Sequence, residues 1–176
     1  MWLITKLRNA ATRGIENTSC PPRLSDQRAV YSASLLSIHA TAQKFYATVL
    51  RDHPDAAEAR AYLADRGITQ ELVDKFGLGY APDRWDTLVQ FLGGRGIARD
   101  AVVDSGLGLK KKSGDGLVDR FRHRIMIPLT DPVGNVVGFT ARIMKSQGQT
   151  TTPDAPKYMN SPESAVYHKG EMLYGL

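Results

Sequence analysis

The sequence predicts an α+β fold, in which amino-terminal helices lead into a small, mainly antiparallel β-sheet with a hairpin. Apolar residues recur at helical spacing over residues 34–53, and shorter helical patterns follow up to residue 104. After the lysine run at residues 110–112, segments rich in Val, Ile, Phe and Thr replace the helical period. With 176 residues, 42% of them hydrophobic, the chain can bury one core of ordinary size.

The first 33 residues show no sustained period and are interrupted by Gly14 and a pair of prolines. We therefore expect a mobile arm over residues 1–33 and one domain over residues 34–176. Cys20 is the single cysteine, so the chain can form no internal disulfide and its arm is not a zinc module. This cysteine content is typical of the reducing cytoplasm, and no apolar run approaches the roughly 18 residues of a membrane span.

The first helix is expected over residues 34–53, where the apolar positions share one face. Pro54 ends this helix because proline cannot continue it. Asp55 then resembles an N-cap, with Glu58 at the capping-box position. We expect the second helix to start there and to close at Gly67.

A third, short helix is expected after a Thr69 cap, with Gly77 as its stop. Its inward-facing residues are predicted to be Leu72, Val73 and Phe76. The stretch GITQELVDKFGLG, which begins at Gly67, has an echo at Gly96 in GIARDAVVDSGLG. In both stretches the pattern predicts a short helix that ends at a glycine and is followed by an extended segment. A further short helix, WDTLVQFL, is expected between them.

A β-hairpin is expected where VDRFRHRIMIPL and NVVGFTARIM flank TDPVGN, whose Pro and Gly favour a tight reversal. If the first strand reaches back far enough, alternate arginines share one face beside Arg142 of the second strand. These arginines are Arg120, Arg122 and Arg124. Guanidinium groups at that spacing suit a row of phosphates. The alternative is an exposed strand face solvated by charge.

The net charge of +5 is concentrated in the last third of the chain. Residues 106–176 carry ten Lys and Arg against six Asp and Glu, whereas residues 1–105 carry thirteen against twelve. This excess favours binding to a polyanion, and a simple aid to solubility is the alternative. The four histidines lie far apart and form no spaced pair of metal ligands.

The segment PKYMNSP combines side chains that suit nucleic acid. Lys157 offers a point charge for a phosphate and Tyr158 a ring for a base or sugar, while Asn160 and Ser161 offer short hydrogen-bonding groups on a proline-limited turn. The glycine after Lys169 would let the backbone approach a partner closely. A structural loop with a packed tyrosine is the alternative.

Four segments together resemble the bacterial DnaG-type DNA primase family. They are AYLADRGIT, FGLGYAPDRWDTL, DRFRHRIMIPLTDPVGNVVGFTARI and PKYMNSPESAVYHKGEMLYGL, and they occur in that family's order and approximate spacing. The resemblance runs from about residue 34 to the last residue. It corresponds to the amino-terminal subdomain of the primase RNA-polymerase catalytic core, and the last two segments are its most specific part.

The resemblance implies an enzyme that synthesises short RNA primers from ribonucleotides on single-stranded DNA, with the replicative helicase as a partner. This activity is that of a nucleotidyltransferase, a DNA-directed RNA polymerase, which acts in the primosome. The family's basic groove for template and primer implies roles for Arg66, Arg142, Lys157, Tyr158 and Lys169, with Asn160 as a further polar position in the same motif.

Two modules of the family have no counterpart in the sequence. The zinc-binding module needs a Cys/His ligand set, and only Cys20 precedes the first helix. The Toprim subdomain, which follows the LYGL segment in the family, supplies the carboxylates that hold divalent metal, Mg or Mn. The acids of the last third are expected in turns or on the surface: Asp115, Asp119, Asp131 and Asp154. We therefore expect no catalytic residue and no metal site within this chain.

The sequence thus predicts a cytoplasmic part of a DNA primase that supplies the basic groove, binds single-stranded DNA weakly and makes no primers alone. Its closing segment is typical of a chain interior, so we expect a truncation at Leu176. One alternative is a stand-alone single-stranded-DNA-binding or accessory module without catalysis, for which Leu176 would be a true gene end. The other is an interaction protein that keeps the fold but not the groove.

Overall fold

The computed structural model describes residues 23–112, 114–144 and 156–171. The helices are α1 (Leu24–Asp52), α2 (Ala57–Asp65), α3 (Gln70–Lys75), α4 (Thr87–Gly93) and α5 (Arg99–Asp104), with the short 3-10 helices η1 (Pro54–Ala56) and η2 (Lys169–Glu171). The strands are β1 (Gly79–Ala81), β2 (Gly108–Lys110), β3 (Leu117–Asp119), β4 (Arg124–Thr130), β5 (Val136–Ile143) and β6 (Tyr158–Asn160). The predicted α+β fold is confirmed.

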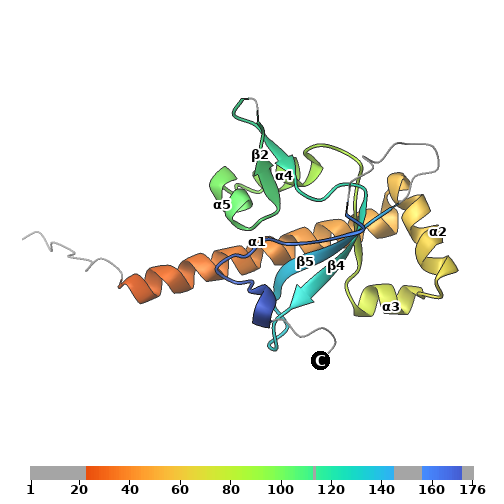
Figure 1. Cartoon of the computed structure of the whole chain (residues 1–176), viewed down its shortest axis with the longest axis horizontal. Helices are drawn as coiled ribbons and strands as arrows, with labels where there is room; N and C mark the ends of the chain where they lie inside the picture. The colour runs from red at the N-terminus through yellow and green to blue at the C-terminus, as the bar shows by residue number, and fades with distance from the viewer. Residues whose placement is uncertain (1–22, 113, 145–155, 172–176) are drawn as a thin grey trace, which may run out of the picture.

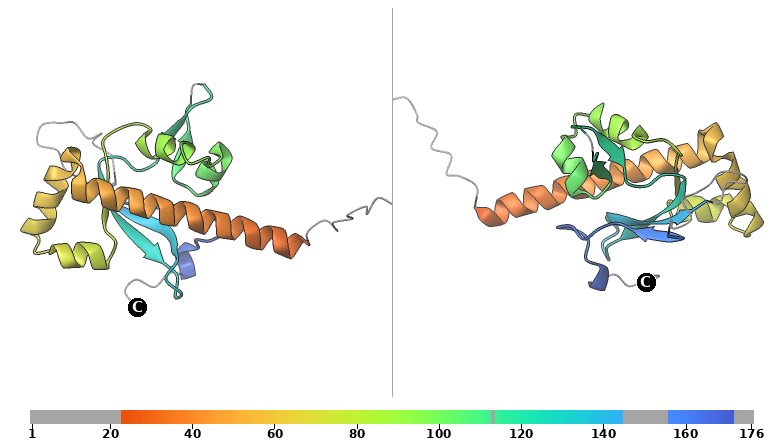
Figure 2. Two further views of the ribbon diagram at one scale, coloured as in Figure 1. Left: turned by 180° about the vertical axis from the view of Figure 1, so that it is seen from behind. Right: turned by 45° about the horizontal axis from the view of Figure 1, so that its top comes forward.

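The long helix α1 runs through the middle of the molecule (Figures 1 and 2). On one side it packs against β1 and β5, and on the other it contacts α4 and α5. Tyr46 of α1 meets Phe139 of β5 edge to face, with ring centres 5.6 Å apart. β1 comes so close to α1 that a Cβ atom at Gly79 would lie 2.5 Å from the Tyr46 Cβ. Glycine at this position therefore allows helix and sheet to share one core.

The main sheet is antiparallel and has the strand order β1-β4-β5-β6, while β2 and β3 form a separate pair. β4 and β5 form the predicted hairpin. β6 pairs Tyr158 with Arg142 and Asn160 with Thr140. Asn160, which the sequence places with Ser161 on a proline-limited turn, is therefore the last residue of an edge strand of the sheet.

The first helix begins at Leu24, well before the predicted start at residue 34. Leu24 is 80% exposed and Val30 is 71% exposed, so the first turns bury no apolar face that could produce a period in the sequence. Residues 1–22 of the predicted arm lie outside the described residues. The division into an arm and a domain stays a prediction.

The two echoing stretches fold alike. Each begins with a glycine at positive φ, Gly67 at 72° or Gly96 at 77°, followed by a short helix, α3 or α5. Each helix ends near a second such glycine, Gly77 at 60° or Gly106 at 72°. Each then enters a strand, but β1 joins the four-stranded sheet and β2 the two-stranded one. The repeated pattern therefore predicts the local path of the backbone but not which sheet receives it.

α3 has the predicted cap, because Thr69 Oγ1 accepts from the Leu72 backbone N–H. Its inward face is narrower than predicted. Val73 is buried, whereas Leu72 is 38% and Phe76 58% exposed. A helix of six residues on the outside of the core has room for little more than one buried side chain.

Asp55 is not the N-cap of the second helix, contrary to the prediction. It lies within η1, where its backbone N–H donates to His53 Nδ1, and α2 begins at Ala57 without a side-chain cap. The Asp55 carboxylate instead accepts from Arg84, 29 residues later. A short 3-10 turn after Pro54 thus replaces the expected capping box.

Candidate nucleic-acid interface

Cationic side chains alternate with aromatic rings where β5 and β6 lie near α2. Arg142 on β5 places its Cζ 4.5 Å from the centre of the Tyr62 ring and 5.9 Å from the Tyr158 ring. Arg66 Cζ lies 5.1 Å from the centre of the same Tyr62 ring. Lys157 Nζ lies 5.8 Å from the Tyr158 ring. We refer to these five residues as the cation–ring cluster.

Local structure explains why the cluster forms. Tyr62 on α2 and Arg66 at its C-cap are four residues apart, so both side chains fall on one helix face. Tyr158 and Arg142 are direct partners in the β5–β6 ladder. The Lys157 carbonyl accepts from the Ile143 backbone N–H at 3.0 Å, which continues this ladder beyond Tyr158. The cluster therefore depends on the sheet pairing that the sequence did not predict.

The cluster is positively charged and open to a ligand. Tyr158 is 53% exposed, Arg66 and Lys157 are exposed, and Arg142 is partly buried with its Nε unpaired. Among residues 23–112, 114–144 and 156–171, no carboxylate forms an ion pair with any of these three cations. Their charge is thus not neutralised within this part of the chain, which favours an anionic partner.

Two other predicted site residues lie differently. Asn160 follows the cluster on β6, where its Oδ1 accepts from Thr140 Oγ1 at 2.6 Å, and its side chain is exposed. Lys169 is exposed on η2, and its backbone N–H donates to Glu163 Oε1. Nearby Tyr167 packs with Leu129 and Val137 in a separate apolar cluster close to the hairpin turn, so Lys169 is not part of the cation–ring cluster.

The predicted row of arginines does not form. β4 begins only at Arg124, and His123 before it has a φ of 50°, which interrupts the extended path. Arg124 is 4% exposed and donates to the Ala141 carbonyl at 3.4 Å and the Pro156 carbonyl at 3.0 Å. Burial lowers the pKa of Arg124 and that of the half-buried Arg120. Because its guanidinium is bound to two backbone carbonyls, Arg124 has a structural role.

Arg122 meets an aromatic partner that sequence reasoning missed. Its Cζ lies 4.0 Å from the centre of the Trp85 ring, and Trp85 is 66% exposed. The sequence does contain a signal for this contact: a tryptophan, a large apolar residue, precedes the short helix in WDTLVQFL, among the polar residues at the start of that helix. Arg122 and Trp85 thus form a second pair of guanidinium and ring.

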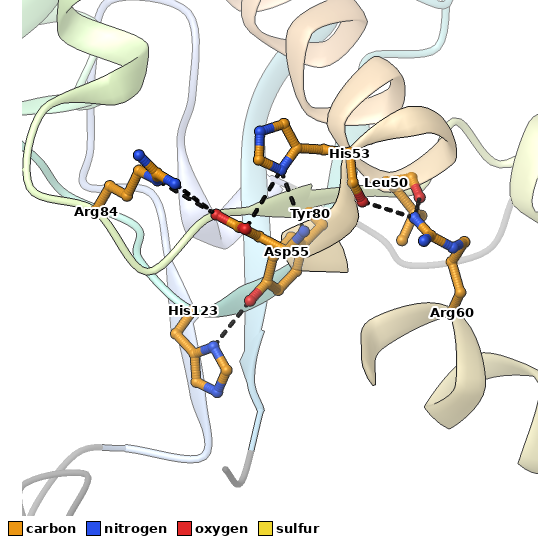
Figure 3. Close-up of polar contacts among 7 residues, drawn as sticks. All are labelled: Leu50, His53, Asp55, Arg60, Tyr80, Arg84 and His123. Atoms are coloured by element: carbon orange, nitrogen blue, oxygen red, sulfur yellow. Dashed lines mark hydrogen bonds and ion pairs between the residues drawn. The ribbon is translucent and has the colours of Figure 1, made fainter. Parts of the chain in front are cut away.

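Polar contacts involve Arg84 and His123, the chain neighbours of Trp85 and Arg122 (Figure 3). Arg84 donates to Asp55 Oδ2 at 3.2 Å, and Tyr80 OH is hydrogen-bonded to His123 Nδ1 at 2.8 Å. Burial raises the pKa of Tyr80 to about 12, so its hydroxyl stays protonated at neutral pH. These contacts tie η1, β1 and the residue after Arg122 together, which positions the second pair.

Asp119 is not the turn or surface acid that the sequence predicts. It is 3% exposed, and its two carboxylate oxygens accept from the Leu88 and Val89 backbone N–H groups at 2.9 Å each. It thereby caps α4 from a distant strand. Burial raises the pKa of Asp119 to about 6, although both N–H donors and Arg122 oppose this shift.

The other predicted surface acids differ in how far they are described. Asp131 does lie in the hairpin turn, where it accepts from the Val133 and Asn135 backbone N–H groups. Asp115 is exposed, and Asp154 lies outside the described residues.

Within the described residues, no group of three or more His, Cys, Asp or Glu side chains could hold a metal ion. Among the described helices, none has the length and hydropathy needed to cross a bilayer.

Comparison with known proteins decides the family. A family model described as the N-terminal domain of the DNA primase catalytic core matches residues 45–176. The chain belongs to this primase family. It is 40% identical over 142 residues to a DNA primase of Pseudomonas aeruginosa and 41% identical over 142 residues to a DNA primase of Streptomyces coelicolor. These alignments cover 81% of the chain but only 20% and 21% of the relatives, so the chain spans about one fifth of their length.

Solved primase structures share the fold. A DnaG primase catalytic domain bound to single-stranded DNA matches with a TM-score of 0.72 and 36% identity, over 84% of this chain and 43% of that one. The RNA polymerase domain of Mycobacterium tuberculosis primase DnaG, in complex with a double-stranded DNA oligomer with an overhang, matches with a TM-score of 0.70 and 34% identity. That match covers 80% of this chain and 41% of the other.

Proposed function

We propose that this chain supplies the surface that holds single-stranded DNA and the RNA primer in a DNA primase. The observation that supports this function best is the cation–ring cluster. Three cations without carboxylate partners in the described residues alternate there with two tyrosine rings. The family's name and the DNA-bound relatives make nucleic acid the fitting partner for this charge.

Each part of the cluster has a distinct role in this proposal. Arg66, Arg142 and Lys157 bind phosphates, and the exposed Tyr158 ring stacks on a base or sugar. The rings also hold the two guanidinium groups in place, which reduces the conformational entropy lost on binding. Contacts to phosphates make the binding independent of sequence and sensitive to salt.

The Arg122–Trp85 pair extends the proposed surface. His123, the residue after Arg122, accepts from the Met144 backbone N–H, and Arg142 is two residues before Met144. The pair and the cluster therefore lie at the same end of the hairpin, where a single strand can contact both. We assign Asn160 to the rim of this surface and Lys169 to a more distant contact with template or primer, and we exclude the buried Arg124.

In a complete primase, we propose, this surface serves primer synthesis from ribonucleotides in the cytoplasm, beside the replicative helicase. Such phosphoryl transfer uses divalent metal, Mg or Mn. The described residues do not fit a metal centre, so we assign metal binding and catalysis to residues outside them. The chain alone is then expected to bind single-stranded DNA weakly and to make no primers; robust primer synthesis by the purified chain would contradict this.

The direct test is a salt titration of DNA binding by Arg142→Gln. We expect affinity for a fluorescent oligo-dT to fall about tenfold, because one charged contact is lost. The slope of log affinity against log salt should become shallower by about 0.7, the value for one phosphate contact with a single strand. Fluorescence anisotropy between low and moderate salt measures both quantities.

Arg51→Gln is a matched control. Arg51 is exposed on α1, and its guanidinium is held by Asp52 through hydrogen bonds of 2.9 to 3.2 Å. It shares no contact with the cation–ring cluster, so its loss should leave affinity almost unchanged. If Arg142→Gln and Arg51→Gln reduce binding equally, the effect is one of net charge, and the proposed surface is wrong.

A further inference from the structure

A hollow of about 460 Å³ lies between α1 and α4. Its lining residues are Lys44, Phe45, Thr48, Val49, Asp52, His53, Pro54, Phe91 and Arg95. None of them belongs to the cation–ring cluster or to the Arg122–Trp85 pair. The volume falls in the range of about 300–1,000 Å³ that is usual for small-ligand sites.

Two partly exposed phenyl rings contribute to the lining of the hollow. Phe45 of α1 and Phe91 of α4 have ring centres 4.6 Å apart and are tilted by 44°. Arg95 Cζ lies 3.7 Å from the centre of the Phe91 ring, so its guanidinium covers one face of that ring. A flat ligand could pack against the exposed part of Phe45, beside this pair, while its polar end meets the guanidinium.

The charged groups of the hollow favour an anion. Lys44 and Arg95 are exposed, and neither forms an ion pair with a carboxylate that the structure describes. Asp52 is the one acid in the lining, and Arg51 binds its carboxylate through Nε at 3.0 Å and Nη2 at 2.9 Å. Among the described residues, the two cations therefore have no carboxylate partner, whereas the one acid of the lining is already paired.

We propose that this hollow binds a small planar aromatic ligand that carries a negative charge, with a mononucleotide as the example that fits. The base would pack against Phe45, beside the Phe91–Arg95 pair, and the phosphate would accept hydrogen bonds from Arg95 and Lys44. A free nucleotide and the terminal nucleotide of a strand share this chemistry. The site shares no residue with the proposed DNA surface.

Calorimetric titration of the 176-residue chain with GMP tests the proposal, with two fragments of the probe as controls. Guanosine lacks the phosphate and ribose 5-phosphate lacks the base, so each should bind at least about tenfold more weakly than GMP. Arg95→Gln and Lys44→Gln should each weaken GMP binding, Arg95→Gln by about tenfold. Arg95→Lys keeps the positive charge and should therefore bind GMP more tightly than Arg95→Gln does. Both positions are exposed, so a thermal unfolding curve should show intact folding.

Two control variants locate the bound nucleotide. Arg142→Gln should leave GMP binding unchanged, while Arg95→Gln should leave oligo-dT binding unchanged, so the two sites can fail separately. Absence of GMP binding, or its loss in Arg142→Gln but not in Arg95→Gln, would overturn the inference. Competition between GMP and a 5′-phosphorylated oligonucleotide distinguishes the sources: displacement of GMP assigns the site to a strand end, and no displacement assigns it to the free nucleotide.

Discussion

Arg124 and Arg142 lie at the same end of one hairpin, yet their surroundings differ. Ile125, the neighbour of Arg124, is the direct β-ladder partner of Arg142. The Arg124 guanidinium is buried and donates to two backbone carbonyls, whereas the Arg142 guanidinium is partly exposed between two tyrosine rings. Residue type and strand position alone therefore do not separate an arginine that supports the fold from one that is available to a ligand.

The two arginines are also connected. One of the carbonyls that Arg124 binds belongs to Pro156, the residue immediately before Lys157 and Tyr158 of the cation–ring cluster. Arg124 therefore anchors the segment that carries two of the five residues of the cluster. The buried Arg124 guanidinium thus helps to position β6, whose Tyr158 ring contacts the guanidinium of Arg142.

The sharpest test of the contrast is Arg124→Met. The substitution keeps an apolar stem but leaves the Pro156 carbonyl without its donor, so we expect a loss of roughly 2–3 kcal/mol in the free energy of unfolding. Urea denaturation measures it. Arg66→Met, at an exposed position of the cluster, should change stability by less than about 0.5 kcal/mol. Similar losses for the two variants would remove the distinction between a structural and a ligand-binding arginine.

Asp119 permits a second test, through pH, in the same segment as Arg124. Its folded-state pKa is raised from 3.8 to about 6, so between these values the folded protein binds a proton that the unfolded chain does not. The free energy of unfolding contributed by Asp119 should therefore fall as pH rises through this window, by up to roughly 3 kcal/mol.

Asp119→Asn cannot titrate and should lack this slope. Urea denaturation of both proteins at several pH values from 4 to 7 gives the comparison, and the difference between the two curves isolates Asp119 from other groups. Parallel curves would mean that the carboxylate is not buried as described.

The smallest expected effect concerns Tyr62, which contacts both Arg66 and Arg142. Tyr62→Leu removes the ring but no charge, so we expect oligo-dT affinity to fall only about threefold to fivefold, with an unchanged salt slope. Tyr62→Phe keeps the ring and should bind like the parent. A steeper or shallower slope in Tyr62→Leu would indicate that the number of phosphate contacts had changed, contrary to a positioning role.

The helices and the hairpin were predictable because their signals are local. Helical spacing in α1 and the glycines around α3 and α5 reflect neighbouring residues, and the turn before β5 has its own proline and glycine. Even there, the exposed first turns of α1 escaped prediction because they bury no apolar stripe. The role of Asp119 escaped as well, because it caps a helix 30 residues earlier in the chain.

The candidate site was predicted in part. The family resemblance implied Arg66, Arg142, Lys157 and Tyr158, and these residues do come together. Tyr62, which connects two of them, was missed because a tyrosine on an amphipathic helix has the pattern of an ordinary core residue. The arginine row failed because one residue, His123, leaves the extended conformation, and no period in the sequence signals such a break.

The cation–ring cluster is assembled from α2, β5 and β6, which are distant in the chain and adjacent only in the native fold. An unfolded chain therefore lacks it, and any oligonucleotide bound there binds the native state alone. By mass action, a strand present at 100 times its dissociation constant would raise the unfolding free energy by about 2.7 kcal/mol. A bound strand would thus make the chain more resistant to denaturation.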